Sequence, residues 1–384
     1  MVASTEPSGT VVAREAGDGV RARNLARLLR RVHLEGPQSR AQLTASTGLN
    51  RSTVADLVAE LVTDGWAIER DPDPVGRVGR PSPVVEASPQ TVVIAVNPEV
   101  DAVEIAAVDL ARRIAVRERI DAKLPSADEV TALVADVVSR WSKGALSGSR
   151  IVGIGVAVPG LVRQAAGLVR NAPHLGWVDE PLAASIAAAT GLPVSVGNDA
   201  SLGALAEHLF GAARGAGDVV YLNGGPSGIG GGIIVQGSAV GGVGGYAGEF
   251  GQNRVRGTES VLEDEVSRAR LLDALGLVSA DDAALAEAIA RSASEAVRAE
   301  CQRQRGILAQ ALADAVNILN PAVVVLGGFL AVLAALDPEA FSAEVASLAM
   351  AENGEGLRIL PASLAADRLL LGAAEVTFSA VGVI

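Results

Sequence analysis

Three consecutive polar residues at the start of a predicted helix, Arg51, Ser52 and Thr53, have the chemistry to recognise DNA. An arginine can form paired hydrogen bonds with guanine or phosphate, and hydroxyl groups can reach phosphate oxygens or base edges. Residues 36–55 contain no acid that would repel a phosphate backbone. We therefore predict that this helix presents its first turn to a DNA groove.

The surrounding residues predict a helix-turn-helix. Ser39 begins the first helix as an N-cap, and Gln42 completes a capping box three residues later. Gly48 permits a sharp turn, and Asn50 can cap the second helix. Leucines at helical spacing predict a further helix at 21–34. The buried stripe of the second helix is expected to contain Val54, Leu57, Val58 and Leu61.

A basic loop follows a predicted strand at 66–70. It carries Arg77 and Arg80 in the glycine-punctuated run 76–81, and an arginine on a narrow loop can enter the minor groove, where the potential is most negative. Any single arginine could instead belong to a solvated surface, but the order of helix, turn, cap, hydroxylated face and basic wing favours DNA binding. The predicted DNA contacts are Ser39, Arg40, Asn50, Arg51, Ser52, Thr53, Arg77 and Arg80.

Charge separates this head from the rest of the chain. Residues 20–85 hold ten arginines and seven acids, a net charge of +3, whereas the whole chain of 384 residues has a net charge of −12. The asymmetry suits a protein that meets nucleic acid through its head alone, although compositional drift would also produce it. We expect a disordered lead at 1–19, a winged helix-turn-helix domain at 20–86 and a body at 90–384.

Composition excludes several classes of protein. No apolar run approaches the roughly 20 residues of a membrane span, and the start of the chain lacks the pattern of a signal peptide. Cys301 is the single cysteine, which excludes an internal disulfide and a cysteine-rich metal site. His33, His174 and His208 are scattered, and each is expected to be structural. We expect a cytoplasmic protein with no cofactor and no membrane partner.

The body predicts an α/β fold, because strands alternate with helices. Strands are predicted at 91–96, 102–108, 114–120, 151–158, 194–196, 218–222 and 322–326, and helical segments at 127–142, 180–190, 200–212 and 281–318. Ligands in such sheets bind at the carboxyl ends of the strands.

Polar residues after predicted strands and on glycine-rich loops could bind a hydroxylated ligand. Asn198 and Asp199 directly follow a predicted strand, and the alternative is a turn that caps the helix at 200–212. Glu249 lies on a loop flanked by glycines and could bind vicinal hydroxyls. Residues 224–251 include thirteen glycines, which fits either a flexible hairpin region or a cradle for phosphate groups.

The order of these motifs resembles the ROK family, which is named for its repressors and sugar kinases. The resemblance runs from about residue 90 to the end, and the head resembles the winged module of the family's repressors, including its Gly-Arg-Pro. It implies an actin-like, sugar-kinase-like (ribonuclease H-like) ATPase-type fold of two lobes with a sugar cleft between them. The matching motifs are Pro159-Gly160, Asn171, Leu175-Gly-Trp177, Gly197-Asn-Asp199, Gly248-Glu-Phe-Gly-Gln252, Asn317-Ile-Leu-Asn-Pro321 and Leu326-Gly-Gly328.

The phosphate-binding parts depart from the family's kinases. Those kinases carry Asp-Gly-Gly-Thr near the first strand, whereas residues 96–101 here are Val-Asn-Pro-Glu-Val-Asp. The proline lacks an N–H donor, and the two acids would repel phosphate. The second phosphate segment keeps its glycines but has Pro226 and Ser227 where the family has Gly-Thr. We predict that kinase activity has been lost and that no residue is catalytic.

The resemblance also assigns ligand residues. In the kinases the aspartate matching Asp199 takes a proton from the sugar hydroxyl, so Asp199 is the vestigial base position. Gln252 replaces a histidine that binds both zinc and sugar, and residues 253–263 contain no cysteine, which predicts no metal. Glu263 matches a sugar-contacting glutamate, although a helix-starting glutamate is an equal alternative. The predicted ligand residues are Asn198, Asp199, Glu249, Gln252 and Glu263.

These features predict a sequence-specific transcriptional regulator, a repressor, that binds double-stranded operator DNA under the control of a sugar or sugar-phosphate effector. A homodimer or homotetramer would space paired recognition helices by about one helical turn, roughly 34 Å. Two alternatives stay open: an active sugar kinase with a DNA-binding extension, and a DNA-binding protein whose body is only a dimerisation scaffold.

Overall fold

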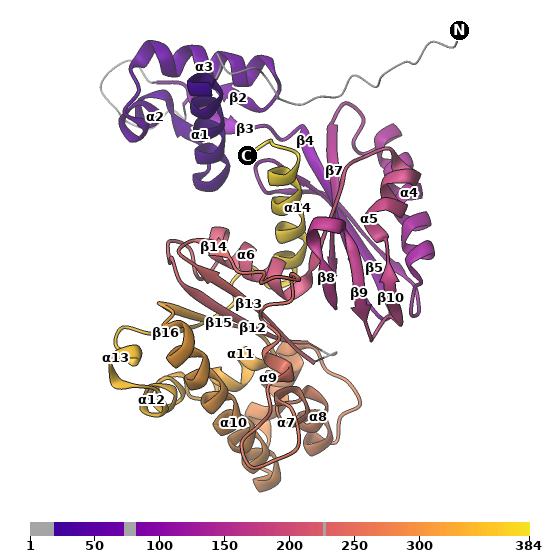
Figure 1. The fold of residues 1–384 in the computed structure, drawn as a ribbon, viewed down its shortest axis with the longest axis vertical. Helices are drawn as coiled ribbons and strands as arrows, with labels where there is room; N and C mark the ends of the chain where they lie inside the picture. The colour runs from indigo at the N-terminus through magenta and orange to yellow at the C-terminus, as the bar shows by residue number, and fades with distance from the viewer. Residues whose placement is uncertain (1–18, 73–81, 226–227) are drawn as a thin grey trace.

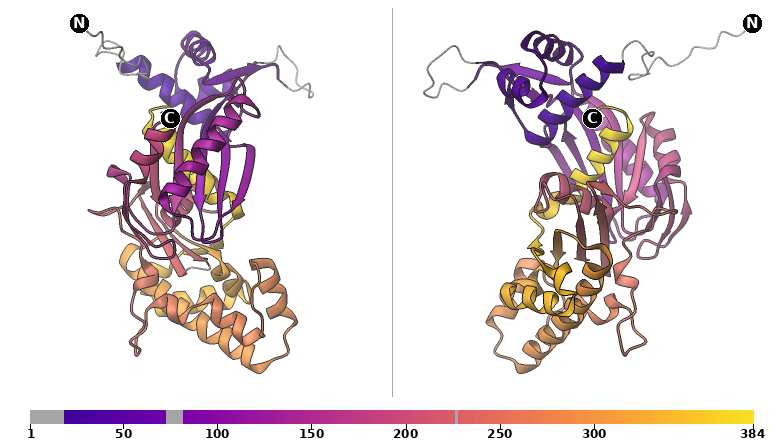
Figure 2. Two further views of the ribbon diagram at one scale, coloured as in Figure 1. Left: turned by 90° about the vertical axis from the view of Figure 1, so that its right-hand side faces the viewer. Right: turned by 60° about the vertical axis from the view of Figure 1, so that its left-hand side comes forward.

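The computed structural model describes residues 19–72, 82–225 and 228–384. A small head lies at one end, a first lobe adjoins it, and a second lobe lies at the far end (Figure 1). Two further views show the same order, with the C-terminus close to the head (Figure 2). Among the described residues, no helix combines the length and apolar character that crossing a membrane requires.

Three helices and a small antiparallel sheet form the head. They are α1 (Gly19–Glu35), β1 (Gln38–Ser39), α2 (Arg40–Thr47), α3 (Arg51–Thr63), β2 (Ala67–Arg70) and β3 (Val84–Ala87), with strand order β1-β3-β2. The predicted caps are confirmed: Ser39 and Gln42 form a capping box on α2, and the Asn50 side chain accepts from the Thr53 amide on α3. Gly48 has the left-handed φ of 73° that the turn requires. Arg77 and Arg80 lie outside the described residues.

The first lobe is built on a five-stranded sheet of order β11-β7-β4-β5-β6. Its strands are β4 (Thr91–Pro98), β5 (Ala102–Asp109), β6 (Ile114–Asp121), β7 (Arg150–Val158) and β11 (Val194–Asn198). Helices α4 (Ala127–Lys143) and α5 (Leu182–Thr190) pack on one face, and α14 (Arg368–Ala380) packs on the other. A second, small sheet contains β8 (Leu161–Arg163), β9 (Leu168–Ala172) and β10 (Trp177–Glu180), with the turn η1 (Gln164–Ala166) between the first two.

The second lobe has its own five-stranded sheet, of order β14-β13-β12-β15-β16. Its strands are β12 (Val219–Gly225), β13 (Gly228–Val235), β14 (Ser238–Ala239), β15 (Val323–Gly328) and β16 (Arg358–Pro361). Its helices are α7 (Leu262–Glu265), α8 (Arg268–Leu275), α9 (Asp282–Arg291), α10 (Glu295–Leu319), α11 (Phe329–Ala335), α12 (Pro338–Leu348) and α13 (Ala351–Gly354), and two short turns are η2 (Phe250–Gln252) and η3 (Ala365–Asp367).

The helical stretch predicted at 281–318 is interrupted. Helix α9 ends before Ser292, and α10 begins after Ser294. The Ser294 amide donates to the Ser292 hydroxyl at 3.2 Å, so a side chain satisfies a backbone group that a continuous helix would use.

Helix α6 (Asp199–Phe210) is shared between the two lobes. Leu202 and Ala206 belong to the hydrophobic core of the first lobe, whereas Ala200 and Ala204 belong to a core on the second lobe's sheet. Helix α14 crosses α6 at Gly372, where a Cβ atom would lie 2.2 Å from the Leu202 carbonyl oxygen. Only a glycine permits so close a crossing.

The head and the first lobe share one continuous hydrophobic core. Leu29, Leu57 and Val85 of the head belong to the same cluster of buried residues as Val93 of β4 and Phe378 of α14. Burial of apolar surface therefore stabilises the junction as well as the head itself.

Polar contacts reinforce this junction on its other side. The Arg150 guanidinium lies 3.5 Å from the centre of the Trp66 ring, and its Nη1 donates to the Asp64 carbonyl at 3.2 Å. The Thr91 hydroxyl donates to the Gly65 carbonyl at 3.1 Å. The C-terminal end of α3 is thereby attached to the first lobe.

Candidate functional site

The N-terminus of α6 carries two of the predicted ligand residues. The Asn198 side chain accepts from the Ser201 amide at 2.9 Å and donates to the Gly160 carbonyl at 3.0 Å. The Asp199 Oδ1 accepts from the Ala200 amide at 2.7 Å. The predicted helix cap is thus confirmed, and it fixes the Asp199 carboxylate where the two lobes meet.

The charges around Asp199 come from distant positions in the chain. Burial raises the pKa of Asp199 to about 6, and the negative charge of Glu249 adds to the rise while Arg368 opposes it. Partial burial and the charge of Glu263 raise the pKa of Glu249. The charge of Glu249 thus acts on Asp199, and that of Glu263 acts on Glu249; we call the three acids the carboxylate cluster.

Glu263 is held in this cluster by two hydrogen bonds. Its Oε2 accepts from the Ile229 amide of β13 at 3.1 Å, and its Oε1 accepts from the Gln252 side chain at 2.6 Å. A Cβ atom at Gly228 would lie 2.4 Å from Glu263 Oε2, and one at Gly251 would lie 2.7 Å from the same oxygen. Glu263 lies in the first turn of α7, as expected if it were a helix-starting glutamate. Its carboxylate nevertheless points toward β13 and η2.

The glycines after β12 allow neighbouring segments to pack closely against each other. A Cβ atom at Gly231 would lie 2.4 Å from the Phe250 ring, and Gly248, with a φ of 101°, approaches the Gly231 carbonyl. A Cβ atom at Gly245 would lie 2.8 Å from the Val162 carbonyl of the first lobe. The segment that carries Glu249 is therefore pressed between β13 and β8.

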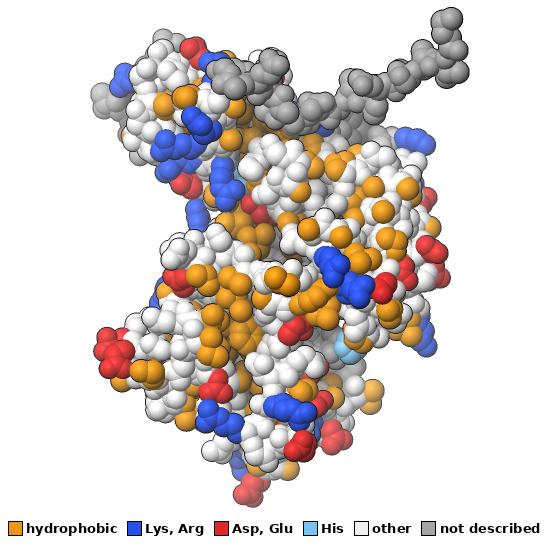
Figure 3. Space-filling view, viewed as in Figure 1, with side chains coloured by type: hydrophobic (Ala, Val, Ile, Leu, Met, Phe, Trp, Pro, Cys, Tyr) orange, Lys and Arg blue, Asp and Glu red, His pale blue; other side chains and the backbone are white. Residues whose placement is uncertain are grey.

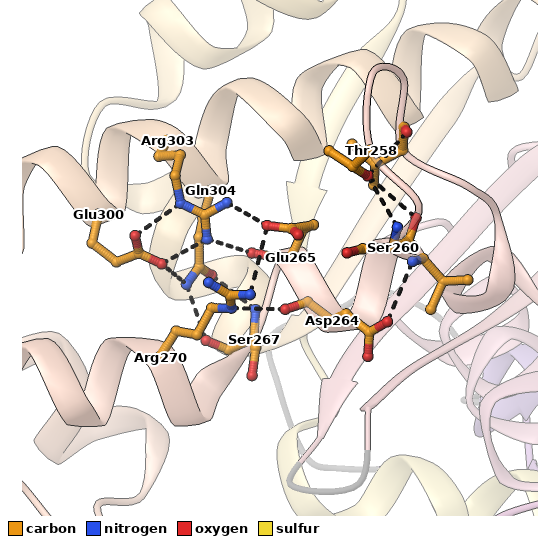
Figure 4. A network of polar contacts seen from close by, with 11 residues as sticks. Thr258, Ser260, Asp264, Glu265, Ser267, Arg270, Glu300, Arg303 and Gln304 are labelled. Atoms are coloured by element: carbon orange, nitrogen blue, oxygen red, sulfur yellow. Dashed lines mark hydrogen bonds and ion pairs between the residues drawn. The ribbon is translucent and has the colours of Figure 1, made fainter.

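A polar network holds α7, the helix that carries Glu263, against α10 (Figure 4). Arg303 of α10 donates to Glu265 and to Glu300, each at 2.8 Å. Gln304 accepts from the Ser267 amide at 3.0 Å and donates to the Ser267 carbonyl at 3.1 Å. Charge-assisted bonds thus attach α7 to α10. Within the part of the chain that the structure describes, no group of three or more histidine, cysteine or acidic side chains could hold a metal ion.

The sequence did not single out Arg368 and Asn223. Arg368 begins α14, and its Nη2 donates to Asn223 Oδ1 at the end of β12 at 3.1 Å. A Cβ atom at Gly327 would lie 2.5 Å from the same Asn223 oxygen. No local motif marks either residue, because they meet only when β12 and α14 come together in the fold.

Polar side chains in the turn after β4 bind one another and an arginine of β6. The Asn97 side chain donates to Glu99 at 2.9 Å, and the Glu99 amide donates to the Ala102 carbonyl at 2.7 Å. Arg119 of β6 pairs with Glu99 at 3.3 Å and with Asp101 at 2.8 Å. Glu99 and Asp101, the two acids expected to repel phosphate, therefore have a protein cation as their partner.

The N-terminus of α3 presents the predicted recognition residues. Arg51 and Ser52 are exposed. The Asn50 Oδ1 accepts from the Ser52 hydroxyl and from the Thr53 amide, each at 2.8 Å. Arg51 forms no ion pair with any residue that the structure describes, so its guanidinium is available to a partner. Basic side chains are visible on this end of the molecule in Figure 3.

Ser39 and Arg40 are engaged within the head. The Ser39 hydroxyl donates to Gln42 at 2.9 Å, and Arg40 Nη2 donates to Glu69 of β2 at 2.6 Å. Both residues thus have structural partners, and their contact with DNA stays a prediction.

The sequence model described as the ROK family matches residues 93–379. The chain belongs to the ROK family. This ROK protein is 27% identical over 317 residues to a xylose repressor from Caldicellulosiruptor bescii, which covers 75% of this chain and 78% of the relative. It is also 31% identical over 232 residues to a glucokinase from Halalkalibacterium halodurans, which covers 52% of this chain and 68% of the relative.

The solved structures extend the likeness to the head. A ROK family transcriptional regulator, described as a homologue of the E. coli Mlc protein, superposes with a TM-score of 0.76 and 22% identity, covering 95% of this chain and 97% of that one. The predicted two-lobed, actin-like fold is confirmed, and the likeness in fold includes the N-terminal head. ROK relatives with repressor names and with kinase names both match this chain.

Proposed function

We propose that this ROK protein is a transcriptional repressor whose affinity for operator DNA is set by a sugar bound between its lobes. The observation that carries the proposal is the combination of a fully capped helix-turn-helix with the carboxylate cluster of Asp199, Glu249 and Glu263. Similarity to a xylose repressor supports a pentose or hexose as the ligand class.

The head supplies the DNA contacts in this proposal. Arg51, Ser52 and Thr53 would enter the major groove, and Arg77 and Arg80 would contact the adjacent minor groove or backbone. A homodimer would place two such helices on a pseudo-palindrome, because one head covers only a half-site. A regulator of this kind acts in the cytoplasm.

The cleft supplies the sugar contacts. Ionised carboxylates accept hydrogen bonds from hydroxyl groups, and the neighbouring Glu249 and Glu263 would engage adjacent hydroxyls of one ring. Gln252 and Asn198 add amide groups that can donate as well as accept. A dense array of such groups would discriminate sugars by the positions of their hydroxyls.

Phosphoryl transfer is not part of the proposed function. A kinase needs backbone N–H groups around the transferred phosphate, and the turn after β4 has Pro98 and two acids paired with Arg119 instead. An active sugar kinase remains the second candidate, because a glucokinase is among the relatives.

The test combines three measurements on the full chain. Duplexes selected from a random pool by the protein should share a pseudo-palindrome, and D-xylose or D-glucose should raise the melting temperature. Sugar-dependent ATP hydrolysis should be absent. Turnover with either sugar would establish the kinase instead, and stabilisation by neither sugar, nor by their phosphates, would favour the dimerisation scaffold.

A further inference from the structure

His33 of α1 is buried where the head meets α6 and α14. Its Nδ1 lies 2.7 Å from the Leu110 carbonyl, and its Nε2 lies 2.8 Å from Glu375 Oε2 on α14. The ring meets Phe210 of α6 edge-on, with centroids 5.7 Å apart, and Phe378 of α14 at 6.1 Å. One head residue thus contacts both helices that lie between the lobes.

The partners of the two His33 ring nitrogens determine where the protons of this contact lie. A carbonyl oxygen only accepts, so the Nδ1 of His33 carries a hydrogen that it donates to Leu110. One further proton lies between Nε2 and the Glu375 carboxylate. With its side chain 1% exposed, His33 has no water to replace these partners, so a displaced ring would leave buried polar groups unpaired.

Helix α6 connects this contact to the predicted ligand residue Asp199. Asp199 lies at its N-terminus and Phe210 at its C-terminus, eleven residues apart, which corresponds to about 16 Å and roughly three turns. The two residues therefore lie on the same side of the helix. A rotation of α6 that follows ligand contact at Asp199 would also move the Phe210 ring.

Helix α14 makes a second connection of the same kind. Arg368, which lies near Asp199 and donates to Asn223, is seven residues before Glu375, or about two turns. The two helices cross in close backbone contact at Gly372, so a displacement of one helix bears directly on the other.

A third contact ties the end of α1 to the segment after α6. The Arg214 Nη2 donates to the Leu34 carbonyl at 3.3 Å, one residue beyond His33. The Arg112 guanidinium lies 4.9 Å from the Phe210 ring centre. The last turn of α1 is therefore sensitive to the position of the C-terminal end of α6.

We propose that the buried contact of His33 with Glu375 and Phe210 transmits the state of the sugar cleft to the DNA-binding head. This inference rests on the proposed function and deepens it, because it names the route of regulation. Lobe movement changes the angle between α6 and α14, and this angle sets the position of the last turn of α1. The core shared by the head and first lobe, to which α1 contributes Leu28, Leu29 and Val32, keeps the head attached during this movement.

The first test measures coupling in the full chain. The variants are His33→Gln, which keeps an amide for Glu375 but removes the ring that meets Phe210, and Phe210→Leu. Phe341→Leu, in the core of the second lobe, and His174→Gln, on an exposed turn, are the matched controls. The readouts are the Kd for a selected duplex with and without saturating D-xylose or D-glucose, and the Kd for the sugar.

We expect both junction variants to bind sugar within about two-fold of the wild type but to lose most of the sugar effect on DNA binding, which is typically five-fold or more in allosteric proteins. The controls should keep that effect. An unchanged sugar effect in both junction variants would overturn the inference.

A second test needs no ligand and so separates this inference from the proposed function. Asp199→Asn perturbs the cleft directly, and amide hydrogen exchange across residues 28–35 of α1 reports the junction. We expect faster or slower exchange there than in the wild type, and no such change when His33→Gln is also present. If neither sugar affects the wild type, the proposed function fails, and the hydrogen-exchange result alone tests the transmission route. Exchange rates in α1 that do not change in Asp199→Asn would then refute that route.

Discussion

Gln252 donates a 2.6 Å hydrogen bond to Glu263, and this bond joins the η2 turn to the first turn of α7. The Ile229 amide holds the other carboxylate oxygen of Glu263, so the acid is fixed from two sides. An amide thus orients the glutamate at a position where, by resemblance, other family members use a metal ligand.

Removing this orientation should weaken sugar binding. Gln252→Ala leaves one Glu263 oxygen without its partner, and a hydrogen bond to a charged group is worth about 1.5–3 kcal/mol. We expect the Kd for the stabilising sugar to rise about ten-fold or more by calorimetry. Gln310→Ala, which removes a similar bond to Asp314 on α10, is the control. Equal affinities for the wild type and Gln252→Ala would place the sugar elsewhere.

Arg51 should dominate recognition of the operator by the head. Arg51→Ala removes an exposed guanidinium at the start of α3, and losing an arginine contact to guanine costs about 1–3 kcal/mol. Fluorescence anisotropy at physiological salt should show weaker binding by about ten-fold, with relaxed specificity at one base pair. Arg291→Ala, on an exposed helix of the second lobe, should bind normally. Undiminished operator affinity in Arg51→Ala would remove α3 from the recognition role.

Asp199 should make stability depend on pH. Folding raises its pKa from 3.8 to about 6, so the folded state binds this proton more tightly than the unfolded chain does. Its contribution to stability is therefore fully present below pH 4 and is lost as the pH rises through 6. In denaturant titrations, the unfolding free energy of Asp199→Asn relative to that of the wild type should rise by about 1–3 kcal/mol between pH 4 and pH 8. A stability difference that stays constant with pH would show that Asp199 titrates normally.

Arg303 should stabilise the second lobe. Arg303→Leu leaves Glu265 and Glu300 without their shared cation, and we expect unfolding to become easier by about 1–3 kcal/mol. Arg254→Leu breaks an exposed pair with Glu259, which should cost less than about 1 kcal/mol. Chemical denaturation of the two variants compares the Arg303 network with the Arg254–Glu259 pair. Equal losses of unfolding free energy would mean that the Arg303 network contributes no more than a surface pair.

Local signals predicted much of the fold. Caps such as Ser39 and Asn50 depend on residues three positions apart, and strands such as β4 depend on unbroken apolar runs, so both can be recognised without tertiary information. The break between α9 and α10 carries its own local signal in Ser292 and Ser294, which the alanine-rich composition outweighed.

The assembly of the site depended on contacts that no local pattern contains. Arg368 meets Asn223 across 145 positions, and His33 meets Glu375 across 342. His33 was expected to be structural because it lies apart from the other histidines in sequence. Its partners, Glu375, Phe210 and the Leu110 carbonyl, come from segments that only the fold brings together.

The core that the head shares with the first lobe bears on how such regulators can be recombined. Leu28 and Val32 lie in one cluster with Leu110 and Phe378, so a head transplanted onto a foreign body would expose apolar side chains that normally face α14. A working chimera would have to carry the last helix of the chain along with its first. Exchange of operator specificity between relatives should therefore proceed by substitutions within α3 more readily than by swapping whole modules.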